Sequence, residues 1–146
     1  MKQRERLLEL LSHRPPMLLL DDVLSVGDRL SESKILIDDA SAFFVCGKGV
    51  PSWIAVEYMG QTAALIAGYQ LEKGIVGPHV GFLLGTRKFE VTTPWFPHAS
   101  QLKVICQELA VVGDSLATFD CRVEDLVTAS VLAKAKLSVF RKPLDQ

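Results

Sequence analysis

The stretch that decides the fold is VPSWIAVEYMGQTAALIAGYQLEK, residues 50–73 of a chain of 146 residues. Pro51 and Ser52 suit the first turn of a helix. Backbone N–H groups in that turn have no partner within the helix, so proline loses nothing by lacking one, and serine can cap or fill the turn. Gly74 follows the last apolar residues, as glycine often does where a helix ends. Because the side chains between are apolar nearly all round, we predict a buried central helix that runs to about Lys73.

One side chain in this stretch does not fit a buried helix. Glu57 carries a carboxylate among apolar neighbours, and a carboxylate is almost never fully buried unless another group pairs with it or a reaction uses it. Two interpretations follow from the residues alone. Glu57 is an acid/base group of a functional site, or it pairs with an arginine or with Gln61 and fixes the geometry of a dimer.

The rest of the chain carries strand signals on both sides of the helix. Before it, apolar runs at 17–26 and 35–37 predict two strands, preceded by a short amphipathic helix over 2–11. After it, long strands form an antiparallel meander, and residues 127–139 alternate almost strictly between apolar and polar side chains. We therefore expect one α+β domain over 1–146, a long antiparallel sheet wrapped around one central buried helix. One helix cannot cover every sheet edge, which favours a dimer.

Composition narrows the function classes. The chain holds 16 Lys and Arg against 17 Asp and Glu, a formal net charge of -1, and these charges are spread along the sequence. There is therefore no electrostatic case for a nucleic-acid or an anionic-membrane partner. No apolar run approaches the roughly 20 residues of a membrane span and no signal-type segment follows the charged N-terminus, so we expect a cytoplasmic protein. Cys46, Cys106 and Cys121 have no metal-binding or disulfide-framework spacing, so we expect neither a metal nor a cofactor.

Two motifs stand out, HRPPMLLLD at residues 13–21 and GVPSWIAVEYMGQ at residues 49–61. The first is similar to the His-Arg-Tyr-Pro-Phe-Leu-Leu-Val-Asp run of the beta-hydroxyacyl-(acyl carrier protein) dehydratases. The second is similar to their Pro-Gly-Val-Leu-x-x-Glu-Ala-Met-Ala-Gln helix. The chain resembles most a divergent group of that family, the predicted dehydratases of aryl-polyene gene clusters. The resemblance implies the hotdog fold.

The resemblance also implies a catalytic pair. The helix acid of the family corresponds to Glu57, an acid/base group in the removal of water from a 3-hydroxyacyl thioester. The family histidine lies 14 residues ahead of the acid, and this chain has Phe43 there. We expect His13, in the first motif, to take the place of that histidine, with His79 and His98 as alternatives.

The same reaction needs a donor for the thioester oxygen and a channel for the acyl chain. Amides at a helix N-terminus suit the first task because the helix dipole favours an anion there, so we expect the N–H of Ser52 to serve. Gln61, one turn after Glu57 on the same face, can orient the carboxylate. The residues expected to line an acyl tunnel are Phe43, Phe44, Phe82, Leu84, Trp95 and Phe96.

Three hypotheses remain open from the sequence. The first is a dehydratase of 3-hydroxyacyl thioesters in fatty-acid or polyene-type synthesis, with an acyl carrier protein or coenzyme A as the carrier. The second is a catalytically impaired hotdog subunit, which binds acyl carrier protein or pairs with a paralogous hotdog chain that supplies the histidine. The third is a hotdog acyl thioesterase, in which the helix acid activates water. The expected assembly is a homodimer, or a heterodimer with such a paralogue.

Overall fold

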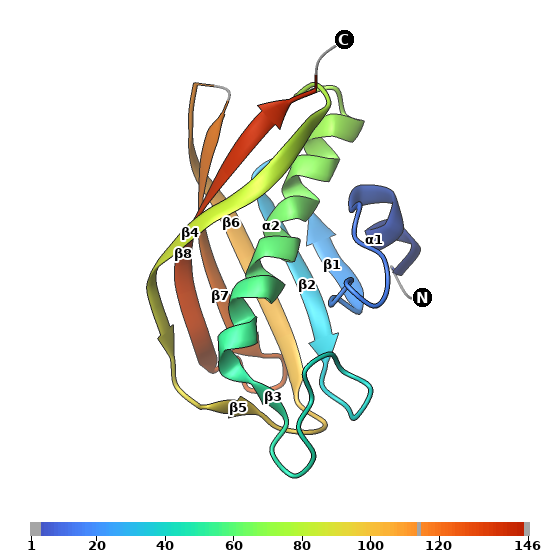
Figure 1. Ribbon diagram of the computed structural model, residues 1–146, viewed down its shortest axis with the longest axis vertical. Coiled ribbons are helices and arrows are strands. Elements are labelled where there is room, and N and C mark those ends of the chain that lie inside the picture. The colour runs from blue at the N-terminus through green and yellow to red at the C-terminus, as the bar shows by residue number, and fades with distance from the viewer. Residues whose placement is uncertain (1–3, 114, 145–146) are drawn as a thin grey trace.

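The structure is a computed structural model that describes residues 4–113 and 115–144. It contains two α-helices, one short 3-10 helix and eight strands (Figure 1). In chain order these are α1 (Arg4–Leu10), β1 (Asp22–Val26), β2 (Leu30–Leu36), β3 (Val50–Pro51), η1 (Ser52–Ile54), α2 (Ala55–Glu72), β4 (His79–Val91), β5 (Trp95–Phe96), β6 (Gln101–Val112), β7 (Leu116–Asp125) and β8 (Val131–Pro143).

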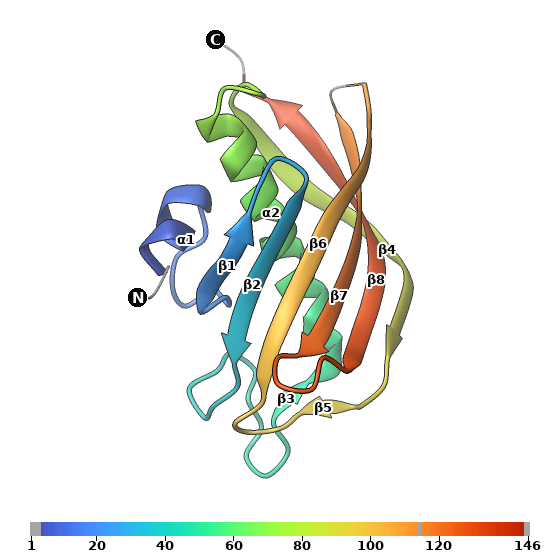
Figure 2. The ribbon, with the colours of Figure 1, turned by 180° about the vertical axis from the view of Figure 1, so that it is seen from behind.

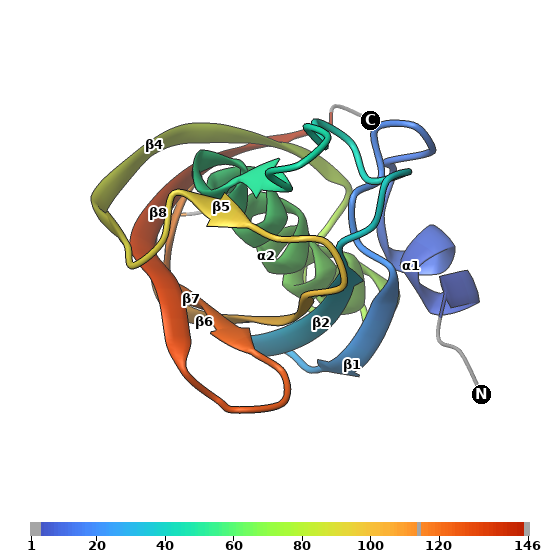
Figure 3. The same cartoon turned by 90° about the horizontal axis from the view of Figure 1, so that it is seen from below.

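Six strands form one antiparallel sheet in the order β1-β2-β6-β7-β8-β4, and β3 pairs with β5 in a separate small sheet. Seen along the helix, the large sheet curves around α2 like an open trough (Figure 3). The view from behind shows β2, β6 and β7 covering the back of α2 (Figure 2). The predicted α+β architecture, a long antiparallel sheet wrapped around one central helix, is confirmed.

The boundaries of α2 also follow the prediction. The turn Ser52–Ile54 leads directly into the helix, and Gly74 ends it with a φ of 72°, a conformation that favours glycine. Apolar side chains of α2, among them Met59, Leu65 and Ile66, are buried against the sheet. The expectation of a helix buried on every face is wrong, however, because Glu57 and Leu71 lie exposed on the side that the sheet does not cover.

Buried hydroxyl groups fix the helix against β2. Ser31 Oγ donates to the carbonyl of Thr62 at 2.6 Å, and the hydroxyls of Ser33 and Thr62 lie 2.7 Å apart. Thr62 in turn donates to the carbonyl of Tyr58 at 2.8 Å. Each of these buried hydroxyls has a hydrogen-bond partner. The contact therefore fixes the orientation of α2 on β2 without leaving a buried donor unsatisfied.

Two predicted strands have different limits in the structure. The segment predicted to be a strand from residue 17 becomes one only at Asp22, and the last strand begins at Val131 rather than at 127. A turn takes up 126–130, because Asp125 accepts hydrogen bonds from the N–H groups of Val127 and Thr128, both at 2.9 Å. Residues 2 and 3 of the predicted N-terminal helix lie outside the described residues.

A glycine in α2 lets α1 pack directly against it. A Cβ added at Gly68 would overlap the backbone carbonyl of Leu10, whereas a Cβ at Gly60 would meet no heavy atom within 4 Å. We therefore expect Gly68→Ala to lower the free energy of unfolding by about 1–3 kcal/mol, since α1 must move. Gly60→Ala is the matched control and should be neutral or raise stability by up to about 1 kcal/mol, through helix propensity. Urea unfolding of the two variants tests this, and equal effects would contradict it.

One edge of the large sheet is left open by its own chain. β4 pairs with β8 on one side only, and it is the last strand in the sheet order. Its first half carries exposed apolar side chains at Val80, Phe82, Leu83 and Leu84. A long open edge with apolar side chains is the usual place for pairing with another chain.

Candidate functional site

A groove of about 520 Å³ runs along the uncovered side of α2. Residues of α1 and the segment after it line one wall, and Gly81 and Leu83 of β4 belong to the other. Small side chains of α2 form the floor, which leaves room along the helix. One end of the groove holds Glu57, and the other end holds His79 and Arg141. Glu57 and Leu71, which also lines the groove, are separated by about 21 Å at the usual helical rise.

Glu57 stands in the first turn of α2 and faces this groove. Its side chain is exposed, and no hydrogen bond or ion pair to it is present in the described part of the chain. The interpretation of Glu57 as half of a pair within its own chain is therefore not seen here. The helix dipole favours a negative charge at this position.

His13 and Gln61 also line the groove. His13 is half-buried, and its buried Nδ1 has no hydrogen-bond partner among the described residues. From the sequence, Gln61 was expected to orient the Glu57 carboxylate, but no hydrogen bond joins the two side chains. Its amide instead holds the segment after His13, because Nε2 donates to the carbonyl of Met17 and Oε1 accepts from the N–H of Leu19, both at 2.9 Å. Gln61 thus fixes the chain that carries His13 against the helix that carries Glu57.

Ser52 differs from its predicted role. Its N–H already donates to the carbonyl of Pro94 at 3.0 Å, next to the pairing of β3 with β5. A bonded amide cannot also polarise a thioester, so the prediction for Ser52 is not supported by this geometry. The next amide in the turn, that of Trp53, takes its place as the candidate donor.

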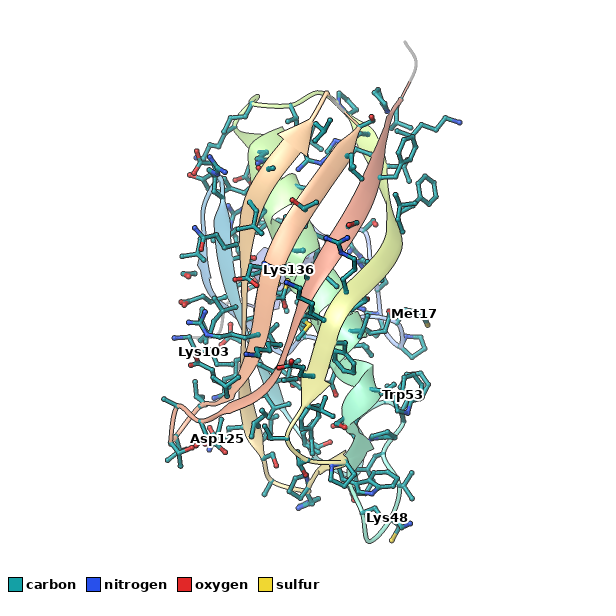
Figure 4. All side chains as sticks on the ribbon, turned by 90° about the vertical axis from the view of Figure 1, so that its left-hand side faces the viewer. Met17, Lys48, Trp53, Lys103, Asp125 and Lys136 are labelled. Atoms are coloured by element: carbon teal, nitrogen blue, oxygen red, sulfur yellow. The ribbon has the colours of Figure 1, made fainter. Side chains whose placement is uncertain are left out.

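An exposed apolar patch surrounds the start of α2. It consists of Met17, Phe43 and Trp53, which are 67%, 56% and 60% exposed. The rings of Phe43 and Trp53 are tilted against each other with centroids 6.2 Å apart. Figure 4 shows Met17 and Trp53 projecting from the same side of the ribbon. Phe43, which stands where the family histidine is expected, therefore packs against Trp53, four residues before Glu57.

The predicted tunnel residues of β4 are not among the groove residues. Gly81 and Leu83 line the groove, whereas Phe82 and Leu84 are exposed and do not. Neighbouring residues of a strand point to opposite faces, and this alternation separates the two pairs. Phe96 is fully buried and packs on Tyr58 with ring centroids 6.3 Å apart, so it is part of the core.

The two alternative histidines take different positions. His79 is at the far end of the groove, with its Nδ1 3.0 Å from the carbonyl of Gly77. His98 is exposed and meets the edge of Phe44, with ring centroids 6.0 Å apart. Of the three histidines, His13 and His79 line the groove with Glu57, and His98 does not.

A buried charged pair, Arg141 with Glu108, was not predicted from the sequence. Arg141 Nη2 donates to Glu108 Oε2 at 2.6 Å, and these residues are only 6% and 5% exposed. Gln70 Nε2 lies 3.4 Å from the other carboxylate oxygen of Glu108 and 2.6 Å from the carbonyl of Asp28. The alternation of inward and outward side chains could have revealed this pair. Arg141 lies four residues after the buried Leu137 on β8, and Glu108 lies two residues after the buried Cys106 on β6, so both side chains point inward.

None of the three cysteines lines the groove, and Cys46 is exposed. Cys106 and Cys121 are buried opposite each other on β6 and β7, as expected of small apolar residues. Burial, with the neighbouring Cys121, raises the pKa of Cys106 well above its ordinary value, so this thiol stays protonated. No group of three or more His, Cys, Asp or Glu placed to hold a metal ion occurs within 4–113 and 115–144. Neither described helix is long and apolar enough to cross a membrane.

The sequence matches the ApeP-like family, described as ApeP dehydratase, over residues 5–146. No curated protein matches the sequence at a significant level. Among solved structures, the chain is similar to the dehydratase heterocomplex ApeI:P from Xenorhabdus doucetiae. That match has a TM-score of 0.81 and 22% identity, and it covers 95% of this chain and 91% of the other.

Several other solved structures with a similar fold are described as thioesterases. A mutant thioesterase from Pseudomonas aeruginosa matches with a TM-score of 0.69 and 11% identity, over 97% of this chain and 94% of the other. A hypothetical thioesterase with coenzyme A from Streptococcus pneumoniae matches with a TM-score of 0.66 and 9% identity, over 86% and 88%. Sequence identities this low show that the fold is shared and do not show a shared function. The matches agree with the hotdog architecture.

Proposed function

Because this chain belongs to the ApeP-like family of dehydratases, we propose that it removes water from 3-hydroxyacyl thioesters, with Glu57 and His13 as the acid/base pair. One observation carries the assignment of the pair. Both side chains line one groove, and Glu57 and the Nδ1 of His13 have no hydrogen-bond partner among the described residues. Free proton-transfer groups that share a groove are what an acid/base site requires.

The chemistry needs two proton transfers. Dehydration breaks the C2–H and C3–O bonds and forms a double bond between C2 and C3. One group takes the C2 proton, and another gives a proton to the C3 hydroxyl, which leaves as water. An imidazole and a carboxyl group can exchange these protons near neutral pH. The N–H of Trp53, at the positive end of the helix dipole, is the candidate donor to the thioester oxygen.

The groove supports an acyl substrate. Its floor beyond Glu57 is made by Gly60, Ala64 and Ala67, which leave space for an alkyl chain along α2. The thioester end would then lie near the start of the helix, at the exposed patch of Met17, Phe43 and Trp53. An acyl carrier protein or coenzyme A can present the same thioester there. Fatty-acid or polyene-type synthesis in the cytoplasm is the setting in which such a substrate arises.

A second candidate function is favoured by the open edge of β4 and by Phe43. In it, this chain pairs with a paralogous hotdog chain, and that partner supplies the histidine that faces Glu57. The similar structure from Xenorhabdus doucetiae is described as a dehydratase heterocomplex, which supports pairing of this kind. A homodimer formed through the same β4 edge is the arrangement expected if His13 serves instead.

The test compares the chain alone with the chain mixed with a paralogous hotdog protein encoded near it. Each preparation receives a 3-hydroxyacyl thioester of acyl carrier protein, and the enoyl product is measured by mass spectrometry. We expect the chain alone to form enoyl product, and His13→Ala to lower the rate about 100-fold or more. His98→Ala, which changes a histidine outside the groove, should leave the rate unchanged.

The remaining outcomes separate the alternatives. Turnover only with the paralogue, insensitive to His13→Ala, would assign the histidine to the partner and reject His13. Release of free thiol without enoyl product would indicate a thioesterase and contradict the proposed dehydration.

A further inference from the structure

The far end of the groove ends in a charged group rather than in an apolar wall. Arg141 lines the groove there, together with His79 and Leu71, although its side chain is almost completely buried. An arginine at this depth is rare unless its charge is compensated. Glu108 provides that compensation through the 2.6 Å bond to Nη2.

Arg141 keeps hydrogen-bonding capacity beyond this pair. A guanidinium carries five N–H donors. Within the described residues, its side chain has one hydrogen bond, from Nη2 to Glu108, so Nε and Nη1 have no protein acceptor. Donors that are held in place, lack a protein acceptor and face a groove are positioned to bind an acceptor atom of whatever occupies it.

The surrounding charges define the kind of acceptor. Glu108 already neutralises Arg141, and both are buried, so a carboxylate or phosphate placed there would meet the Glu108 carboxylate at close range. An uncharged oxygen, such as a hydroxyl or a carbonyl, accepts the free N–H groups without that repulsion. Gln70, which lies 3.4 Å from Glu108, helps to hold the carboxylate and therefore the guanidinium in place.

We propose that Arg141 is a specificity-determining residue that binds an uncharged oxygen at the distal end of the acyl chain. The proposal rests on the proposed function, because the reacting end of the substrate is taken to lie at Glu57. The groove then selects substrates by two features: a tail that spans the roughly 21 Å between Glu57 and Leu71 along α2, and an oxygen at the end of that tail. Methyl-terminated chains of the same length would leave the donors of Arg141 unpaired.

The test measures binding, so that it does not depend on turnover. Two long-chain acyl pantetheine amides serve as probes; neither has a 3-hydroxyl, and they differ only in a terminal hydroxyl or a terminal methyl group. We expect the hydroxyl-terminated probe to bind the unmodified protein about tenfold more tightly, as one hydrogen bond to a charged group allows. Equal affinity for the two probes would overturn the proposal.

Variants assign the preference to Arg141. Arg141→Lys keeps the charge beside Glu108 but removes the donors at the positions of Nε and Nη1, because the ammonium is compact and stays at the carboxylate. It should bring the affinity ratio close to one. Arg141→Met combined with Glu108→Leu removes the pair as a unit and should favour the methyl-terminated probe. The matched control is Lys136→Met combined with Asp120→Leu, an ion pair of 3.7 Å on the outer face of the sheet, where Figure 4 shows Lys136. Its ratio should stay at that of the unmodified protein.

The outcomes distinguish this inference from the proposed function. A tenfold preference that is lost in Arg141→Lys supports the role of Arg141, even if no thioester is dehydrated. A preference that persists in both Arg141 variants contradicts it, whether or not dehydration is observed.

Discussion

Glu57→Gln should lower kcat for dehydration by about 10²–10⁴-fold, the usual contribution of a positioned acid/base group. Glutamine keeps the size of the side chain and its hydrogen-bonding atoms but cannot exchange a proton. Because Glu57 is exposed at the groove and has no partner in the described chain, the substitution should leave the fold and the unfolding midpoint unchanged. Initial rates of enoyl formation, with circular dichroism as a check on folding, measure the effect.

The control for this prediction is on the same helix. Glu72→Gln changes an exposed acid at the other end of α2, which pairs with Arg6 and does not line the groove. It should retain the rate of the unmodified protein. Full activity in Glu57→Gln would exclude Glu57 as the proton-transfer group.

Breaking the buried pair of Arg141 and Glu108 should have the largest effect on stability. Glu108→Leu leaves a buried guanidinium without its carboxylate, and such a loss typically costs about 3–5 kcal/mol. Replacing both residues, as in Arg141→Met with Glu108→Leu, removes the charge altogether and should restore most of that loss. Urea unfolding of the two single variants and of the double variant gives the coupling energy between them.

An exposed pair gives the scale for comparison. Removing Lys136 and Asp120, which are partly exposed and 3.7 Å apart, should change the free energy of unfolding by no more than about 1 kcal/mol. If Glu108→Leu costs as little as this surface pair, the two buried charges are not interdependent.

Local signals in the sequence predicted the central elements well. Pro51 and Gly74 bound α2, because helix ends depend on residues close to the end itself. The alternation of apolar and polar residues located most of β8 for a similar reason, since a strand with one buried face repeats every two residues. The same rule identifies Arg141 and Glu108 as inward-facing once the alternation is followed to the ends of β8 and β6.

Features that depend on distant contacts were not predictable in this way. The acceptor for the Ser52 N–H is Pro94, which the chain brings close only when β3 pairs with β5. The partners of Gln61 lie in the segment after His13, more than 40 residues earlier. The exposure of Glu57 was also missed, because an apolar helix face looks the same in sequence whether its own chain or another molecule covers it.

The open edge of β4 bears on how the protein must be produced. Its first half exposes apolar side chains, whereas Arg87, Lys88 and Glu90 place charges along the second half. Unpaired backbone groups beside apolar side chains invite strand addition by any neighbouring chain, while charges discourage it. Under the proposed pairing with a paralogous chain, an excess of this chain leaves its β4 edge uncovered and open to unwanted strand addition. Balanced synthesis of the two chains would then be the simplest protection.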